Sequence, residues 1–434
     1  MQFLESATQL KVEEVPQQPL IPDIRTRVLP EGYELVPGLN SIYEIELALA
    51  EASALSKDDA VRRSAYFARI DGRETLHYKL CSGSPLQVDQ SSFRMKAFFT
   101  IFKFKTSYAT HGLFPYRGKF HPQLIKAIMN IIGLKSGDLV LDPMTGSGTT
   151  NIEASVIGIN SIGLDMNPFA VFMARAKLNG LSLTDRQLSE LESTAKSDFA
   201  ALSNREDGLV KGTKNSKQLK LNEIHPIVLL CYLDAVGYSS RVKTKTLQEL
   251  FPIVLHRYVT AIRNFSEVRD QLDLRLGNAR IEHADAREMK DILPDSVDGI
   301  VTSPPYSFAI DYIKGDAPQL QYLGYDIKAL RDTMIGLRGK GLKNQVYAYT
   351  EDMNRVLSEM ARVLKPDRYA VVIIGSNTVQ LEKVLNATGL RLEDELVKIG
   401  EKHNLHLVQR FERPIEGIQN VMRSEHILFL KKHI

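Results

Sequence analysis

Residues 140–150 read Val-Leu-Asp-Pro-Met-Thr-Gly-Ser-Gly-Thr-Thr, an apolar run followed by a glycine-rich turn and a helical pattern. Gly146 and Gly148 allow backbone to come close to a ligand, and the start of the following helix offers unpaired N–H donors. The pattern is not a dinucleotide fingerprint, because its third glycine would fall at Asn151. A second predicted strand ends at Asp165, where nucleoside-binding α/β folds hold a ribose diol. The region therefore predicts an α/β fold that binds a nucleoside.

A second motif, Thr302-Ser303-Pro304-Pro305-Tyr306, follows an apolar run that we expect to form a buried strand. The two prolines end this strand in a rigid turn, with a hydroxyl on one side and an aromatic ring on the other. Such a turn suits a planar base that is held by its face and its exocyclic amino group. Ser303 and the Pro304 carbonyl would accept hydrogen bonds from that amino group, while Tyr306 would stack on the base. An ordinary proline-rich turn is the alternative.

Together the two motifs resemble those of the S-adenosylmethionine-dependent DNA amino-methyltransferases, which methylate cytosine N4 or adenine N6. The resemblance covers roughly residues 106–180 and 277–434, and it implies S-adenosylmethionine as the cofactor. It assigns the catalytic turn to Ser303, Pro304, Pro305 and Tyr306. The cofactor-binding residues that it implies are Lys119, His121, Pro122, Asp142, Pro143, Met144, Gly146, Gly148, Thr149, Asp165, Asp285 and Ala286.

The resemblance implies methyl transfer to the exocyclic amino group of a DNA base that has flipped out of the stack. The serine at position 303 favours cytosine N4 over adenine N6 as the target. RNA is the alternative substrate, since tRNA guanine-N2 methyltransferases carry a similar pair of motifs. A non-catalytic nucleic-acid-binding subunit on the same fold is a further alternative. A cognate restriction endonuclease is left open as a partner.

Other chemistries lack support in the sequence. Methylation at cytosine C5 needs a thiolate nucleophile, yet neither Cys81 nor Cys231 follows a proline or lies in a polar turn. The ten histidines form no cluster with metal-ligand spacing, so we expect no metal. We find no signal peptide and no apolar run that could span a bilayer, which predicts a cytoplasmic enzyme without a membrane partner. The net charge of +3 does not by itself indicate a nucleic-acid partner.

The 434 residues predict two or three domains. Strands and helices alternate, so we expect an α/β fold with a parallel sheet and helices on both faces. The family resemblance implies that this is a Rossmann-like seven-stranded methyltransferase sheet. The expected regions are an N-terminal accessory region at 1–105, a cofactor-binding half at 106–180, a mainly helical insertion at 181–276 and a catalytic half at 277–434. The insertion and the N-terminal region are equal candidates for target recognition. In the latter, 65–70 and 75–80 read as two strands around a turn.

Residues 336–344, Gly-Leu-Arg-Gly-Lys-Gly-Leu-Lys-Asn, form a glycine-rich stretch with three basic residues and no acid. We expect a flexible cationic loop that contacts nucleic-acid phosphates beside the target base, through Arg338, Lys340 and Lys343. A solvated loop without a partner is the alternative.

Overall fold

The computed structural model describes most of the chain, and the predicted catalytic residue Tyr306 lies outside the described part. The described residues are 29–37, 39, 41–82, 107–116, 119–204, 224–239, 244–305, 311–376, 378–414 and 424–433. Among them, no helix is both long enough and apolar enough to cross a membrane.

Seven strands form one sheet in the order β6-β5-β4-β7-β8-β10-β9. In chain order they are β4 (Leu139–Asp142), β5 (Asn160–Asp165), β6 (Ala279–His283), β7 (Val297–Thr302), β8 (Leu364–Ser376), β9 (Leu405–Pro414) and β10 (Ser424–Lys432). The strands from β6 to β8 are parallel, whereas β10 runs antiparallel to β8 and β9. The order reverses between β4 and β7, which is where open α/β sheets bind ligands. The predicted fold class is confirmed.

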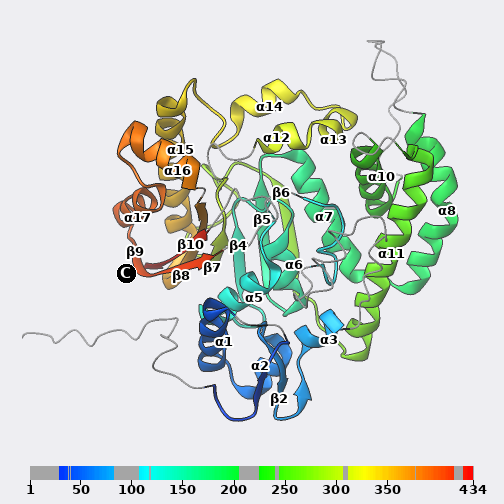
Figure 1. Ribbon diagram of the computed structural model, residues 1–434, viewed down its shortest axis with the longest axis horizontal. Coiled ribbons are helices and arrows are strands. Elements are labelled where there is room, and N and C mark those ends of the chain that lie inside the picture. The colour runs from blue at the N-terminus through cyan, green and yellow to red at the C-terminus, as the bar shows by residue number, and fades with distance from the viewer. Residues whose placement is uncertain are drawn as a thin grey trace, which may run out of the picture.

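Both faces of the sheet are buried. Successive residues of each strand point to opposite faces, so neighbouring residues join different hydrophobic clusters. Val140 and Val301 join one hydrophobic cluster, while their neighbours Leu141 and Ile300 join a second. Helices α5 (Pro122–Ile131) and α6 (Thr149–Val156) belong to the first cluster. Helices α15 (Leu342–Val363) and α17 (Leu392–Lys402) belong to the second, and with α16 (Thr378–Thr388) they form the left-hand side of Figure 1. Helix α7 (Pro168–Ser182) packs along β5 and β6.

The described part of the predicted helical insertion contains α8 (Asp185–Ser203), α10 (Pro226–Ser239) and α11 (Leu247–Gln271). These three helices form the right-hand edge of Figure 1 and share a hydrophobic cluster with residues of α7 and of the segment 107–116. That cluster includes residues of the short helices that follow the proline turn, which are α12 (Tyr312–Gly315), α13 (Ala317–Tyr322) and α14 (Ile327–Thr333). Hydrogen bonds from Gln319 to the Leu233 carbonyl (3.1 Å) and from Tyr322 to the Leu202 carbonyl (2.9 Å) join α13 to the insertion.

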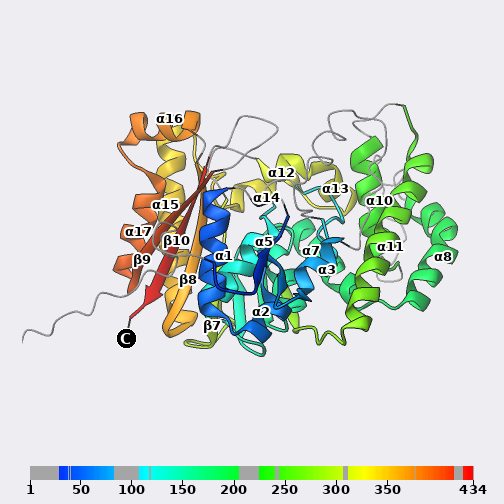
Figure 2. The same cartoon turned by 60° about the horizontal axis from the view of Figure 1, so that its bottom comes forward.

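An N-terminal module packs against α5, and Figure 1 shows it at the bottom, at the opposite end from α12 and α14. After a 60° turn it comes to the front of the sheet (Figure 2). Its elements are β1 (Tyr33–Leu35), α1 (Ile42–Ala54), α2 (Lys57–Arg63), β2 (Phe67–Ile70), β3 (Arg73–Glu74) and α3 (Leu76–Ser82). Buried Leu47 and Phe67 share the hydrophobic cluster of α5, so the module has no separate core within the described residues.

The strand expected over residues 75–80 is wrong, because this segment forms helix α3. Thr75 begins the helix by accepting a hydrogen bond from the Tyr78 N–H at 3.1 Å. Leu76 and Leu80, four residues apart, are both buried, as a helix that packs on one face requires. The alternation of apolar residues at 76, 78 and 80 favours a strand, but the Thr75 cap and the four-residue spacing of the buried leucines favour the helix that forms.

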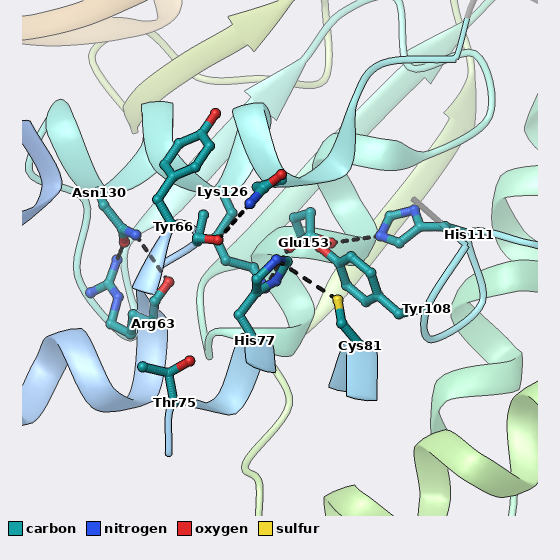
Figure 3. A network of polar contacts seen from close by, with 12 residues as sticks. Arg63, Tyr66, Thr75, His77, Cys81, Tyr108, His111, Lys126, Asn130 and Glu153 are labelled. Atoms are coloured by element: carbon teal, nitrogen blue, oxygen red, sulfur yellow. Dashed lines mark hydrogen bonds and ion pairs between the residues drawn. The ribbon is translucent and has the colours of Figure 1, made fainter. Parts of the chain in front are cut away.

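A buried polar network joins the module, α5, α6 and the segment 107–116 (Figure 3). At its centre lies Glu153 of α6, which is fully buried. Its Oε1 accepts hydrogen bonds from the Tyr108 hydroxyl at 2.5 Å and from His111 Nε2 at 2.6 Å, and its Oε2 lies 3.1 Å from Lys126 Nζ. Lys126 in turn contacts His77 Nδ1 of α3 at 3.2 Å. A carboxylate is therefore stable in this core because each of its oxygens has a partner.

A second set of buried polar contacts fixes the module to α5. The Glu51 carboxylate accepts hydrogen bonds from the N–H groups of Ala65 and Tyr66 and from Asn130 of α5. Asn130 also accepts a hydrogen bond from Arg63 at 3.0 Å. Because these groups are buried and satisfy one another, the module is an integral part of this fold.

We predict that Glu153→Gln lowers the free energy of unfolding by about 3–5 kcal/mol, because it leaves the buried Lys126 ammonium without a counter-charge. Urea unfolding measures the change. Asp58→Asn is the control, since its ion pair with Arg73 is exposed (83% and 52%). This control should change stability by about 1 kcal/mol or less. A Glu153→Gln variant as stable as the control would contradict the account of the network.

The same network predicts a pH dependence. Burial acts to raise the pKa of Glu153, but Lys126 and the hydrogen bonds from His111 and Tyr108 lower it from 4.5 to about 2. A group whose pKa is lower in the folded state than in the unfolded state stabilises the fold. This stabilisation is fully present above the unfolded-state pKa and is lost as the pH falls through the folded-state pKa. The wild-type protein should therefore lose stability between pH 4.5 and about 2 by an amount that Glu153→Gln does not lose.

Candidate active site

A cavity that is open to solvent lies at the carboxyl ends of β4, β5, β6 and β7. The structure brings both sequence motifs to this one cavity. The predicted residues that line it are Lys119, Pro143, Met144, Gly146, Thr149, Asp165, Ala286, Ser303 and Pro305.

The glycine turn and the acid of β5 are joined by a hydrogen bond. The Gly146 N–H donates to Asp165 Oδ2 at 2.8 Å, and Asp165 Oδ1 accepts from the Asn167 N–H at 2.8 Å. Burial raises the pKa of Asp165. Gly146 and Gly148 have φ of +50° and +79°, and a Cβ on Gly148 would lie 2.9 Å from the Ala174 side chain. Two glycines are thus required here, one at the cavity and one where α6 packs on α7.

Asp142 holds the glycine turn to the proline turn without lining the cavity. Its buried Oδ1 accepts hydrogen bonds from the Thr302 hydroxyl at 2.8 Å and from the Met144 N–H at 3.2 Å. Burial raises the pKa of this carboxyl to about 6. Since Ser303 follows Thr302 directly, this pair fixes the end of β7 relative to the end of β4. Pro304, His121, Pro122 and Gly148 also lie outside the cavity lining.

Two tyrosines that the predicted set omits form an aromatic wall. The rings of Tyr116 and Tyr312 stack with centroids 6.3 Å apart and planes 18° apart, and both line the cavity. Tyr116 lies over the glycine turn, since a Cβ on Gly146 would come within 3.5 Å of its ring. Tyr116 lies within residues 106–180, which carry part of the family resemblance, and Tyr312 closely follows the proline turn. The position of each tyrosine near a motif was the signal by which sequence reasoning could have placed it in the site.

Two charged groups adjoin these tyrosines, the half-buried Lys119 and the buried Asp316. Lys119 Nζ donates to the His111 carbonyl at 3.0 Å, and burial lowers the pKa of this lysine to about 8. Asp316 accepts a hydrogen bond from the Asn167 side chain at 2.8 Å, and burial raises its pKa to about 7. Lys119 is thereby tied to the segment that Glu153 anchors.

Two predicted site residues are engaged in ion pairs. The Asp285 carboxylate accepts hydrogen bonds from the Arg287 guanidinium, and its neighbours Ala284 and Ala286 line the cavity in its place. Arg338 contacts the buried Asp352 of α15, with Nε 3.2 Å from Oδ2. The expectation of a loop that continues to residue 344 is wrong, because α15 begins at Leu342 and contains Lys343. Lys340 and Lys343 are exposed.

Comparison with known proteins gives a family match. Residues 113–229 match the model of the RMKL-like, methyltransferase domain. This range contains Tyr116, the glycine turn and Asp165, and it ends in α10 before the proline turn.

Three curated relatives are similar to parts of the chain. The Type II methyltransferase M.MjaII of Methanocaldococcus jannaschii is 46% identical over 68 residues, which cover 16% of this chain and 13% of that protein. The Type II methyltransferase M.BsoBI of Geobacillus stearothermophilus is 23% identical over 275 residues, covering 51% of this chain and 54% of that protein. A tRNA (guanine(10)-N2)-dimethyltransferase of Methanothermobacter thermautotrophicus is 36% identical over 72 residues, covering 17% of this chain and 21% of that protein.

The chain thus spans at most about half the length of these curated relatives. Its strand order, the cavity at the strand ends and the match to a methyltransferase domain nevertheless agree with one another. Residues 113–229 are therefore similar to a methyltransferase domain, and this matched part contains the glycine turn and Asp165 of the cavity.

Proposed function

We propose that this protein transfers a methyl group from S-adenosylmethionine to the exocyclic amino group of a base in DNA, with cytosine N4 as the favoured target. One observation carries the proposal. Gly146 and Asp165 of the glycine turn line the same cavity as Ser303 of the proline turn. A nucleoside site and a site for an amino group therefore meet in one place. Adenine N6 is the second base atom that this turn could serve.

The cofactor end of the cavity has donors and acceptors that fit S-adenosylmethionine, which when bound supplies an electrophilic methyl group. Each oxygen of Asp165 accepts a backbone N–H and keeps a further lone pair, which suits a ribose diol. Lys119 lines the cavity with a pKa that burial lowers to about 8. A carboxylate beside it would favour its charged form. We assign Asp165 to the ribose and Lys119 to the methionine carboxylate.

The base end would activate the amino group by hydrogen bonding. The nitrogen lone pair of such a group is delocalised into the ring, so the free amine is a poor nucleophile. The Ser303 oxygen and the Pro304 carbonyl would accept its two N–H bonds and turn the lone pair toward the methyl donor. Tyr306 would stack on the base, which is worth about 1–3 kcal/mol for base–aromatic contacts. Tyr312 adds aromatic surface beside the turn.

DNA and RNA are both candidate substrates. The serine of the turn and the 275-residue alignment with M.BsoBI support DNA. The similarity to a tRNA (guanine(10)-N2)-dimethyltransferase supports guanine N2 in RNA as a second candidate. For target recognition we favour the helical insertion over the N-terminal module, because the insertion packs on α12 and α13 beside the cavity.

Labelled methyl transfer to DNA and to RNA tests the function. DNA should accept the label, and Ser303→Ala should reduce kcat on the order of 10²-fold, because it removes one acceptor for the amino group. The cofactor dissociation constant should stay within twofold of wild type. Ser296→Ala, in the turn before β7, is the matched control and should not change kcat. Label on neither DNA nor RNA would overturn the proposal.

The glycine turn can be tested separately by calorimetry with S-adenosylhomocysteine. Gly146→Val should abolish binding, because the branched side chain would enter the cavity beside Tyr116. Gly133→Val is the control, since Gly133 also has a positive φ (+76°) but no atom within 4 Å of an added Cβ. Both variants carry the backbone strain of a left-handed valine. Equal affinity in the two variants would remove the glycine turn from the cofactor site.

The basic stretch predicts a salt dependence. Changing Lys340 and Lys343 together to Ala should flatten the slope of log affinity against log salt by up to about 1.8, since each phosphate contact contributes about 0.9. Sequence preference should survive, because phosphate contacts position the protein without reading bases. Lys398 and Lys402 on α17 serve as the control pair. If the slope of log affinity against log salt changes equally in the two double variants, Lys340 and Lys343 make no specific phosphate contact and belong to a solvated surface.

A further inference from the structure

Arg287 connects four separate parts of the fold, although nearly all of its side chain is buried (8% exposed). Its Nε and Nη2 donate to the Asp285 carboxylate just after β6, at 2.9 Å and 2.8 Å. Its Nη2 also lies 2.9 Å from the Thr333 carbonyl at the end of α14 and 3.4 Å from Met166 Sδ after β5. Its Nη1 donates to Asp352 of α15 at 2.9 Å.

These partners define two segments of the cavity lining. Met166 lines the cavity, and so do Ala284 and Ala286 on either side of Asp285. Thr333 directly precedes the lining segment 334–337. Arg287 itself does not line the cavity. It therefore sets the distance between the strand-end wall and the 334–337 wall without touching a ligand.

The second wall needs such a tether. Gly336, Gly339 and Gly341 all have positive φ, so the segment between α14 and α15 contains three residues whose backbone conformation no side chain restricts. The guanidinium group offers five N–H donors in a rigid fork, whereas a lysine ammonium offers three donors from one point. Only an arginine can hold the carboxylate of Asp285, the Thr333 carbonyl and Asp352 at the same time with this geometry.

We propose that Arg287 is a positioning residue for cofactor binding, and that it fixes the segment 334–337 against the ends of β5 and β6. The inference rests on the proposed assignment of this cavity to S-adenosylmethionine. Asp352 extends the arrangement, because its buried carboxylate is shared by Arg287 and the half-exposed Arg338. Loss of Arg338 leaves Asp352 paired with Arg287, so Arg338 should affect the nucleic acid and not the cofactor.

The test compares Arg287→Lys with Arg362→Lys. Arg362 is a matched control, since it joins α15 to the Met289 and Ile292 carbonyls in the same way (2.8 Å and 2.9 Å) but lies outside the cavity lining. Calorimetry with S-adenosylhomocysteine gives the dissociation constant, and thermal unfolding gives Tm. Both variants should lower Tm. Only Arg287→Lys should raise the dissociation constant, by tenfold or more, while kcat at saturating cofactor changes less than threefold.

Two further variants keep the inference falsifiable if Arg287→Lys does not fold. Asp352→Asn keeps an acceptor for Arg287 but removes the charge, and it should raise the dissociation constant at least threefold. Arg338→Met should leave that constant unchanged. Folded Arg287→Lys or Asp352→Asn with wild-type affinity would overturn the positioning role. A wild-type protein that binds no S-adenosylhomocysteine would overturn the proposed function instead.

Discussion

The hydrogen bond from the Thr302 hydroxyl to Asp142 Oδ1, 2.8 Å long and fully buried, joins the two turns on which the proposed chemistry depends. One turn follows β4 and the other follows β7, and these strands lie side by side although about 160 residues separate them in the chain. Because parallel strands end at the same edge of a sheet, both turns open into one cavity. Asp142 does not line this cavity, and its hydrogen bonds join the two turns that do.

The part of the cavity wall that Tyr116 forms is linked to the buried charge of Glu153. Glu153 of α6 binds Tyr108 and His111, and the same short segment carries Tyr116 over the glycine turn. Lys126 balances the carboxylate and contacts the N-terminal module through His77. Among the described residues, this network of side chains connects the N-terminal module to the segment that lines the cavity through Tyr116.

Local patterns in the sequence were sufficient for the individual strands of the sheet. The strands after residue 138 and the helices between them follow from apolar runs, glycine turns and prolines, and their alternation predicts a parallel α/β sheet. The seven-stranded methyltransferase sheet was expected from the family resemblance. Two kinds of feature could not be predicted. Helix α3 was missed because the cap at Thr75 and the Leu76–Leu80 spacing compete with apolar alternation. The pairs Asp285–Arg287 and Arg338–Asp352 were missed because an ion pair between distant elements has no local signature.

Identification of the methylated nucleoside tests the central claim most directly. After reaction with DNA of mixed sequence and methyl-labelled S-adenosylmethionine, the product is digested and its nucleosides are separated by mass spectrometry. The account predicts N4-methyldeoxycytidine, formed by the wild-type protein and formed on the order of 10²-fold more slowly by Ser303→Ala. N6-methyldeoxyadenosine would keep the mechanism and change the base. Label at a carbon atom of the base, or an unchanged yield in Ser303→Ala, would contradict an amino group held by the proline turn.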